Sequence, residues 1–410
     1  MFSVEEIRKD FPMLDNKTMS GKPLVYLDNG ATTFKPYSVI EAVTNYYTNQ
    51  TCNAHRGDYQ LAADVSAQYE EARDAVAKLI HCQSKEVVFT SGASMSLNLA
   101  AYGYGQKNLQ KGDVILITEA EHASNVLPWF RVAEVTGAVV EYIPLTDEGR
   151  VTPENLKKAL HDKVKIVAFA AVSNVLGYVN DVKELVRLAH EQGAKAVVDG
   201  AQAVPHMEVN VSEWDIDFLA FSAHKMCGPT GVGVLYGKYN LLEETDPFML
   251  GGGANARFDM CGNVQLKHAP FKFEAGTPPI EGVLGLKAAC EYIMSVGYEN
   301  ISRHEHELRT YLTDQIKKLD HVILYNPNAE TGIVTFNVRK IFSQDVASYL
   351  GTKGICVRSG SHCAKILVNF LKTSDTVRAS LYFYNTKEDC DALVEALKTT
   401  TIENCVGIFF

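Results

Sequence analysis

The chain has 410 residues, which is long enough for two or three lobes and at least one large core. Hydrophobic residues make up 46% and charged residues 21%, an ordinary composition for a globular protein. The net charge is −10 and no long basic run occurs, so neither nucleic acid nor an anionic membrane is expected as a partner. No apolar stretch is as long as a membrane span, and the start MFSVEEIRKDF is typical of an amphipathic helix and not of a signal peptide, so we expect a cytoplasmic protein.

Short apolar runs alternate with helical patterns in the first half of the chain. The strand-like runs cover 86–90, 113–118, 138–143, 165–172, 195–199, 217–222 and 233–236. The amphipathic stretches between them cover 94–106, 125–136, 153–160 and 182–192. This alternation predicts βα units that build a mostly parallel sheet with helices on both faces. Ligands bind beyond the carboxyl ends of the strands in such sheets, so the residues after each run are the first candidates for a site.

The pattern changes after Gly251, where the chain is irregular and polar to about Pro279. Helical periodicity then returns, followed by strand-like runs at 323–326 and 332–338. We therefore predict a large domain over residues 16–279 and a smaller α/β lobe formed by residues 280–410 together with 1–15.

The first two runs each end near a polar side chain. EVVFTSGASMSLN (86–98) reads as a strand, a small-residue turn and a helix start, where the hydroxyl of Ser94 and backbone N–H groups can approach an anion. An ordinary turn capped by Ser94 is the simpler interpretation of this segment taken alone. His122 follows the run DVILIT at the mouth of the sheet, although a lone histidine is more often structural.

The later runs end in a more specific set. Asp199 closes an apolar strand, and its carboxylate needs a facing cation, either a protonated pyridine nitrogen or an Arg or Lys elsewhere. Lys225 follows the run DFLAFS and, beside a bound phosphate, is placed to form a Schiff base; alone it fits a phosphate-binding or surface lysine equally well. Gln202 could bond a phenolic oxygen. Together, the Asp, the Gln and the Ser-x-His-Lys segment that contains Ser222 and His224 match the chemistry of one cofactor, pyridoxal 5'-phosphate (PLP).

At this point the sequence resembles the PLP-dependent cysteine desulfurases of aminotransferase class V, over almost the whole chain from YLDNGATT (26–33) to VRASLYFYNT (377–386). The most specific blocks are NAHRG (53–57), EHASNVLPW (121–129), VSNVLG (172–177), VDGAQAV (198–204), FSAHKMCGPTGVGVLY (221–236), FEAGTP (273–278) and RSGSHCA (358–364). The short RSGSHCA segment is similar to the group that serves the SUF iron–sulfur assembly system, which includes selenocysteine lyase-like members. The resemblance implies an aspartate-aminotransferase-like fold (fold type I) and a homodimer.

The resemblance also implies how the cofactor is held. Lys225 would bind PLP, His122 would stack on its ring, Asp199 would pair with the pyridinium nitrogen and Gln202 would bond the phenolic oxygen. The phosphate would be held by Ser94, Ser222, His224 and, from the second subunit, Thr277. No metal site is expected, because the nine cysteines are scattered and never spaced as Cys-x-x-Cys.

The resemblance implies which residues bind the substrate and receive its sulfur. Asn174 and Arg378 would take the substrate carboxylate, and Arg358 would line the same pocket. Cys363 would be the sulfur acceptor, in a segment whose small residues predict mobility and where Arg358 and His362 could favour the thiolate. A buried packing cysteine fits such polar surroundings poorly. His55 and Arg56 would lie at the entrance, near the dimer contact.

The expected activity is therefore the conversion of L-cysteine to L-alanine, with sulfur transferred to an enzyme persulfide for iron–sulfur cluster assembly and then to a SufE-like or SufU-like acceptor. A selenocysteine lyase acting on L-selenocysteine and a class V aminotransferase without sulfur transfer are the alternatives; the latter would not need Cys363. The chain departs from the family pattern at Ala93, Met95, the segment GGGAN (251–255), Pro279 and the pair Lys365-Ile366. None of these departures removes a group that the reaction needs.

Overall fold

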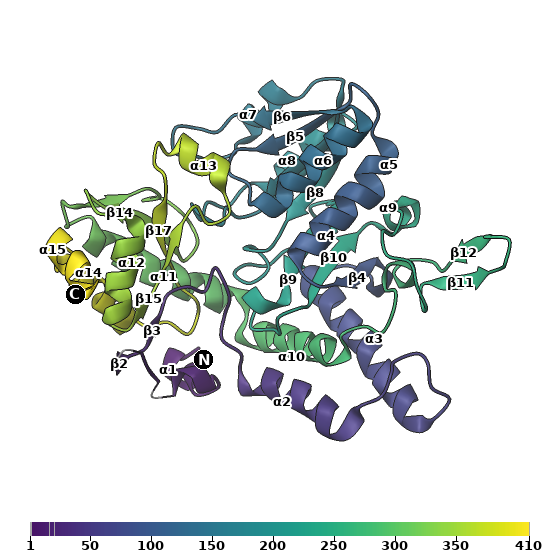
Figure 1. Ribbon diagram of the computed structural model, residues 1–410, viewed down its shortest axis with the longest axis horizontal. Coiled ribbons are helices and arrows are strands. Elements are labelled where there is room, and N and C mark those ends of the chain that lie inside the picture. Colours follow the sequence, from purple (N-terminus) through teal and green to yellow (C-terminus); the bar gives the residue numbers. More distant parts are fainter. Residues whose placement is uncertain (1, 16, 20, 410) are drawn as a thin grey trace.

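A seven-stranded sheet forms the centre of the computed structural model, which describes residues 2–15, 17–19 and 21–409 (Figure 1). Its order is β4 (Val87–Thr90), β10 (Gly233–Gly237), β9 (Phe218–Ser222), β8 (Lys195–Asp199), β7 (Val164–Ala170), β5 (Val114–Thr118) and β6 (Val139–Ile143). Neighbouring strands from β9 to β6 are parallel, and β10 runs antiparallel to both of its neighbours. The predicted mostly parallel sheet of fold type I is confirmed.

Helices cover both faces of this sheet, so its strands are buried on both sides and read as continuous apolar runs. One face packs on α3 (Gln60–Ile80), α8 (Val182–Glu191) and α10 (Ile280–Val296). The other face packs on α4 (Ala93–Leu99) and α6 (Leu127–Thr136).

Helix α8 shows how the sequence specifies one of these helices. The Asp181 side chain accepts a hydrogen bond from the backbone N–H of Glu184 and so caps the first turn. Val182, Leu185, Val186 and Ala189 are buried, a spacing of three and four residues that places them on one face. The charged residues between them therefore face solvent.

A second, antiparallel sheet lies in the C-terminal part of the chain, in the order β13 (Val322–Leu324), β14 (Ile333–Val338), β17 (Thr376–Ser380) and β16 (Arg358–Gly360). It shares a core with α11 (Tyr298–Ile316), α12 (Ser343–Thr352) and α14 (Lys387–Lys398). The smaller α/β lobe is therefore present.

Two features cross the predicted division at residue 279. Helix α10 packs on α2 (Tyr37–Asn45) and α3, within the core of the large sheet. In the other direction, β3 (Val25–Tyr26) pairs in parallel with β15 (Ile355–Cys356). The exact division of the chain into domains stays a prediction.

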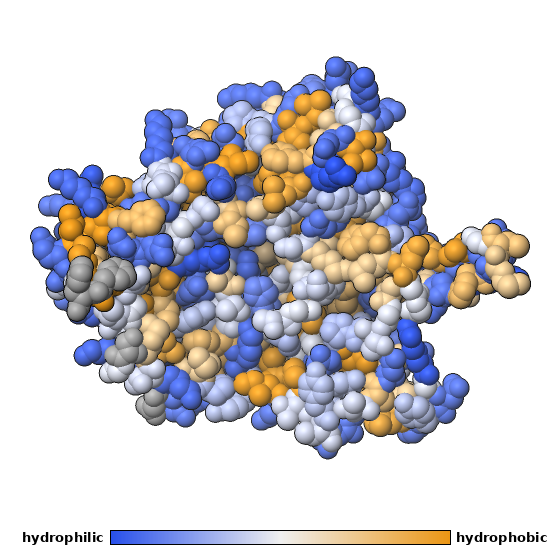
Figure 2. All heavy atoms as spheres, viewed as in Figure 1, coloured by the Kyte–Doolittle hydropathy of each residue, from blue (hydrophilic) through white to orange (hydrophobic). Residues whose placement is uncertain are grey.

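The remaining elements lie around these two sheets. A hairpin of β11 (Asn255–Phe258) and β12 (Val264–Leu266) projects from the body of the molecule (Figure 1), and the apolar side chains Phe258, Met260 and Val264 on it are exposed (Figure 2). The others are α1 (Val4–Arg8), β1 (Thr18–Met19), β2 (Lys22–Pro23), α5 (Gln106–Asn108), α7 (Pro153–Ala159), α9 (Tyr239–Glu244), α13 (Lys365–Phe370) and α15 (Ile402–Val406). Within the described part of the chain, none of the helices combines the length and the apolar character needed to cross a membrane.

Candidate active site

A cavity of about 220 Å³ lies where the carboxyl ends of the large sheet meet the smaller lobe. It is lined by all but one of the predicted site residues, namely Ser94, His122, Asn174, Asp199, Gln202, Ser222, His224, Lys225, Arg358, Cys363 and Arg378. The exception is Thr277, whose hydroxyl accepts a hydrogen bond from Asn53 Nδ2 at 3.3 Å away from the cavity. Its expected role across a dimer contact stays a prediction.

Lys225 stands at the centre of this cavity, in the short turn that directly follows β9. Asp199 ends the neighbouring strand β8, where it pairs in register with Ala220 of β9. Burial lowers the pKa of Lys225 to about 8, and the nearby Asp199 carboxylate opposes this shift. A substantial fraction of the lysine is therefore the free amine, the nucleophilic form, at mildly alkaline pH.

One end of the cavity is rich in hydrogen-bond donors. Ser222 Oγ accepts a hydrogen bond from the backbone N–H of Ala93 at 2.8 Å, and the hydroxyls of Ser94 and Ser124 are 2.6 Å apart. Burial, together with the charge of Lys225, lowers the pKa of His224 to about 4, so this ring is neutral and offers an N–H and not a cation. Such a set suits a phosphate, which accepts several hydrogen bonds at once.

The departures at residues 93 and 95 have a simple structural outcome. Ala93 retains the backbone N–H that reaches Ser222, so only a side-chain donor is lost. Met95 points its thioether back to Ser91, which approaches it at 3.3 Å through Oγ and 3.4 Å through N. Met95 therefore does not line the main cavity.

His122 follows β5 and has a defined tautomer. Its Nδ1 accepts a hydrogen bond from the backbone N–H of Ser124 at 3.1 Å, so the proton of the neutral ring is on Nε2. Burial lowers the pKa of His122, which keeps the ring neutral near pH 7.

Glu121, next to His122, was not anticipated from the sequence. Its buried carboxyl accepts hydrogen bonds from Thr118 Oγ1 at 2.6 Å, Asn125 Nδ2 at 2.7 Å and Ala170 N at 3.1 Å. Burial raises the pKa of Glu121 to about 7, although these donors favour the charged form. The network ties the turn that carries His122 to β7.

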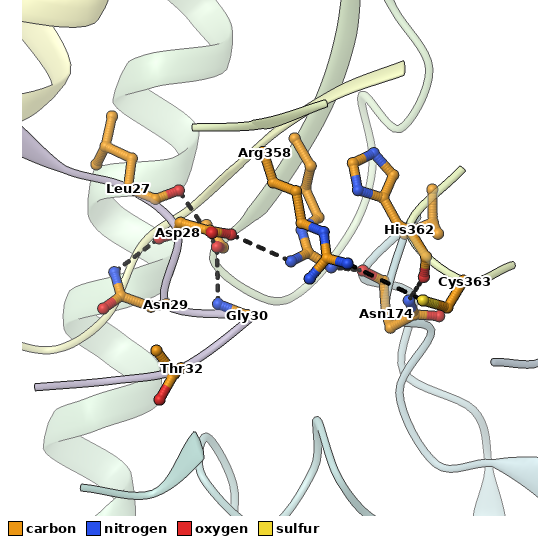
Figure 3. A network of polar contacts seen from close by, with 12 residues as sticks. Leu27, Asp28, Asn29, Gly30, Thr32, Asn174, Arg358, His362 and Cys363 are labelled. Carbon is orange, nitrogen blue, oxygen red and sulfur yellow. Dashed lines mark hydrogen bonds and ion pairs between the residues drawn. The ribbon is translucent and has the colours of Figure 1, made fainter. Parts of the chain in front are cut away.

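Arg378 lies on β17 with 2% of its side chain exposed, so it is a buried arginine and not one that forms a surface salt bridge. Its Nη1 donates to the carbonyl of Asn174 at 2.7 Å, and its buried Nε has no hydrogen-bond partner among the residues described. The amide of Asn174 donates to the carbonyl of His362 at 2.8 Å (Figure 3). A buried guanidinium with an unused N–H is suited to receive a carboxylate.

Cys363 is exposed, and its backbone is held in place. Its carbonyl accepts a 2.7 Å hydrogen bond from Ala123 N, and the carbonyl of the preceding residue accepts one from Asn174; the expected mobility of this segment stays a prediction. Arg358 Nη2 is 4.0 Å from the sulfur (Figure 3). Arg358 is therefore the cation nearest to the thiol among the residues drawn in Figure 3.

The expected contribution of His362 to this thiolate is wrong. The ring is buried, and Nε2 lies 2.9 Å from Thr376 Oγ1. Burial, reinforced by the nearby Arg378 and Arg358, lowers the pKa of His362 to about 3. The ring is therefore neutral, because two permanent cations beside it disfavour a third charge.

The residues present fit PLP. Gln202, which is buried, donates through Nε2 to the carbonyl of Gly30 at 2.8 Å, while its Oε1 has no partner in the described chain. The lining of the cavity thus combines phosphate donors, the Lys225 amine, the Asp199 carboxylate and Arg378, whose Nε has no partner among the described residues. The donors suit the anionic phosphate of PLP, the lysine amine suits its aldehyde, and the Asp199 carboxylate suits its pyridinium. The guanidinium of Arg378 suits the carboxylate of an amino acid.

His55 and Arg56 line a different cavity, of about 670 Å³, below α3 and the hairpin. His55 Nε2 pairs with Glu70 at 3.1 Å, and Arg56 Nη2 donates to the carbonyl of Gly252 at 2.8 Å. Their expected place at the entrance of the active site stays a prediction.

Comparison with known proteins agrees with this geometry. The model of the aminotransferase class-V family matches residues 25–393, and the chain belongs to this family. It is 46% identical to a probable cysteine desulfurase of Halalkalibacterium halodurans (97% of this chain, 98% of the other) and 43% identical to one of Staphylococcus aureus (97% of each).

Solved structures lead to the same result. The cysteine desulfurase CsdA of Escherichia coli superposes with a TM-score of 0.91 at 35% identity, covering 100% of this chain and 99% of the other. A cysteine desulfurase of Thermococcus onnurineus superposes with a TM-score of 0.92 at 39% identity, covering 97% and 98%. The identification of the chain as a PLP-dependent cysteine desulfurase is confirmed.

Proposed function

We propose that this cysteine desulfurase takes L-cysteine in the cavity around Lys225 and receives its sulfur on Cys363, releasing L-alanine. The observation that carries the proposal is the position of one exposed thiol, Cys363, in the lining of the same cavity as the buried amine Lys225. A class V aminotransferase without sulfur transfer has no use for such a thiol.

The substrate is bound by its carboxylate. Arg378 has its Nη1 occupied by Asn174 and its Nε unsatisfied, so a carboxylate completes its hydrogen bonding. Arg358 lies beside the same space and contributes a second positive charge. Charge-assisted pairing of a carboxylate with a guanidinium fixes orientation as well as affinity.

Proton transfers are assigned to two groups. Lys225, with its lowered pKa, can be a free amine that accepts a proton from the substrate. His122, with its proton on Nε2, can donate that proton to a group bound in the cavity. PLP itself, when bound, supplies an electron sink that makes the bond between Cβ and sulfur cleavable.

The sulfur then moves to the protein. The thiolate of Cys363 attacks the substrate sulfur, a new S–S bond forms, the Cβ–S bond breaks, and the bonding pair remains on the substrate carbon. A proton delivered to that carbon gives alanine, and the protein keeps a persulfide. Arg358, 4.0 Å from the thiol sulfur, stabilises the negative charge at the start and at the end of this step.

The decisive experiment supplies purified holoenzyme with L-cysteine and, separately, with L-selenocysteine. Alanine and sulfide or selenide are quantified, and persulfide on each cysteine is located by alkylation and mass spectrometry. Equal amounts of alanine and transferred sulfur from L-cysteine, with persulfide on Cys363, are the expected result. Turnover confined to L-selenocysteine would replace the proposal with a selenocysteine lyase.

Three finer features belong to the same proposal: the protein is of the SUF type, works as a homodimer in the cytoplasm, and passes its sulfur to a SufE-like or SufU-like acceptor. The exposed apolar residues Phe258, Met260 and Val264 on the projecting hairpin support a dimer, since burial in a second subunit would remove them from water. Light scattering of the purified protein tests the dimer. Transfer of labelled persulfide to each acceptor tests the partner.

A further inference from the structure

Asp28 lies against the guanidinium of Arg378 and has no role in the reaction as derived above. Its Oδ1 is 3.4 Å from Arg378 Nη2, and 24% of its side chain is exposed. It belongs to the block YLDNGATT, where the chain leaves β3 and forms a single parallel bridge to Ser380. Figure 3 shows Asp28 on one side of the arginine side chains and Cys363 on the other.

The segment that carries Asp28 is tightly seated against Arg378. A Cβ built on Gly30 would come within 3.2 Å of both Cζ and Nη2 of Arg378, so the backbone touches the guanidinium directly. Hydrogen bonds also hold both backbone polar groups of Gly30. Its N–H donates to Ser380 Oγ at 2.8 Å, and its carbonyl accepts from Gln202 at 2.8 Å. The segment that begins at Asp28 is therefore rigid and packs along one side of Arg378.

The nitrogens of Arg378 are used unequally. Nη1 donates to the Asn174 carbonyl at 2.7 Å; among the described residues, Nη2 makes only the long contact to Asp28 and Nε has no partner. Nε and Nη2 are adjacent donors of the same planar group, which is the pair that a carboxylate grips in two places. A contact of 3.4 Å is weak for a charged pair, so a better-placed carboxylate can compete for Nη2.

The charges around Asp28 explain why a second carboxylate is tolerated beside it. Arg378, Arg358 and Lys225 are all close enough to act on its carboxylate. With no substrate bound, Asp28 offsets part of this positive charge. A substrate carboxylate brings a second negative charge to the same cluster and makes it more nearly neutral.

We propose that Asp28 is a positioning residue for the substrate carboxylate: it orients the Arg378 guanidinium with Nε free and yields Nη2 to the carboxylate of an incoming α-amino acid. The inference rests on the proposed role of Arg378. The proposed role predicts that Asp28 affects the binding of ligands that carry an α-carboxylate and does not affect the binding of amines that lack one. A purely structural role would affect both classes alike.

The test compares L-alanine with ethylamine, which is the same molecule without its carboxylate. Each is titrated into the holoenzyme, and the change in the cofactor absorption band reports binding without sulfur chemistry. Asp28→Asn should weaken L-alanine binding about tenfold, which corresponds to ~1.4 kcal/mol, and should leave ethylamine unchanged within the error. Asp28→Glu, which keeps the charge, should recover part of the loss.

Two further variants make the outcome unambiguous. Asp246→Asn removes a carboxylate paired with Lys107 that does not line the cavity, and it should titrate like the wild type. Arg378→Ala should weaken L-alanine more than Asp28→Asn does. If Arg378→Ala weakens L-alanine and the Asp28 variants do not, or if they weaken both amines equally, the inference is wrong and the role of Arg378 stands. If Arg378→Ala has no effect, both are wrong.

Discussion

The backbone N–H of Ala123 donates a 2.7 Å hydrogen bond to the carbonyl of Cys363. Ala123 follows His122, so this bond joins the turn after β5 in the large sheet to the loop after β16 in the smaller lobe. Both partners are main-chain atoms. The thiol is therefore held near His122 by contacts that do not depend on the side chain at position 363.

This relationship predicts that Cys363→Ala loses sulfur transfer but keeps the site. We expect PLP content and the absorption spectrum to match those of the wild type, while sulfide release falls by a factor of at least about 100, or ~2.7 kcal/mol in activation free energy. Cys261→Ala is the matched control, because Cys261 is also an exposed thiol but lies on the hairpin. Wild-type sulfide release by the Cys363 variant would assign the transfer to another group.

Borohydride reduction should fix PLP to Lys225. The reason is that burial lowers the pKa of Lys225 to about 8, so much of it is a free amine. Among the described residues, Lys35 is the nearby lysine whose pKa is also lowered to about 8, and it is the competitor to exclude. Lys35 donates to the carbonyls of Thr33 and His224, so its amine is already engaged. Peptide mapping after reduction distinguishes the two lysines, and a label on Lys35 would contradict the assignment.

The rate of cofactor capture by the apoenzyme should rise with pH through about 8. The reason is that burial lowers the pKa of Lys225 from its ordinary value near 10.5 to about 8, so half of the amine is already free at that pH. Below pH 7 the lysine is mostly protonated and capture should be slow. Stopped-flow mixing of apoenzyme with PLP between pH 6 and 10 measures this profile; a midpoint near 10 would show an ordinary, solvated lysine.

Arg378→Ala should retain PLP and respond feebly to cysteine. Removal of the guanidinium deletes the donors that would hold the substrate carboxylate, so kcat/KM should fall by about 100-fold or more, ~2.7 kcal/mol. Arg378→Lys should recover only part of this, because a point charge cannot make two parallel hydrogen bonds. Steady-state kinetics on both variants, with Arg358→Ala for comparison, decide which arginine is the anchor; an unchanged kcat/KM for Arg378→Ala would point to Arg358.

A stability prediction concerns the buried pair of Arg73 and Glu274, which joins α3 to the segment after the hairpin. Arg73 Nη1 donates to Glu274 at 2.7 Å, and the carboxylate also accepts from Phe89 N at 2.9 Å. Glu274→Ala leaves the guanidinium with its pair to Glu70 at 2.9 Å but removes its buried partner and the acceptor of Phe89 N, so it should reduce the free energy of unfolding by about 1–3 kcal/mol. Glu213→Ala, which breaks the exposed pair with Lys183, should have no measurable effect. Equal denaturation midpoints for the two variants would contradict this.

Much of the candidate site was predictable because it follows from strand order. Asp199, Lys225 and His122 each come directly after an apolar run, and the carboxyl ends of parallel strands meet at one edge of a sheet. The strand-forming runs were recognisable because helices cover both faces of the sheet, so the residues on both sides of each strand are buried and apolar. The residue types at those ends then indicate PLP without any knowledge of their distances.

Other features could not be predicted, because they depend on partners far away in the chain. Thr376 and the two arginines near His362 come together only when β16 and β17 pair, and this pairing keeps the histidine uncharged. The buried carboxyl of Glu121 owes its raised pKa to burial between β5 and β7. Neither the uncharged state of His362 nor the raised pKa of Glu121 can be read from the residues beside them in the sequence.

The sequence by itself determined the sheet and the cofactor, and it made Lys225 and Cys363 the candidates for the chemistry, since these depend on residue type and on periodicities of a few residues. The tertiary structure alone decided the lowered pKa values of Lys225 and His362 and left Nε of Arg378 without a partner among the described residues. It also placed Asp28 beside that arginine, 350 residues away along the chain. Burial and hydrogen-bond partnership are properties of the packed molecule, and they set which of the candidate groups is charged, neutral or unsatisfied.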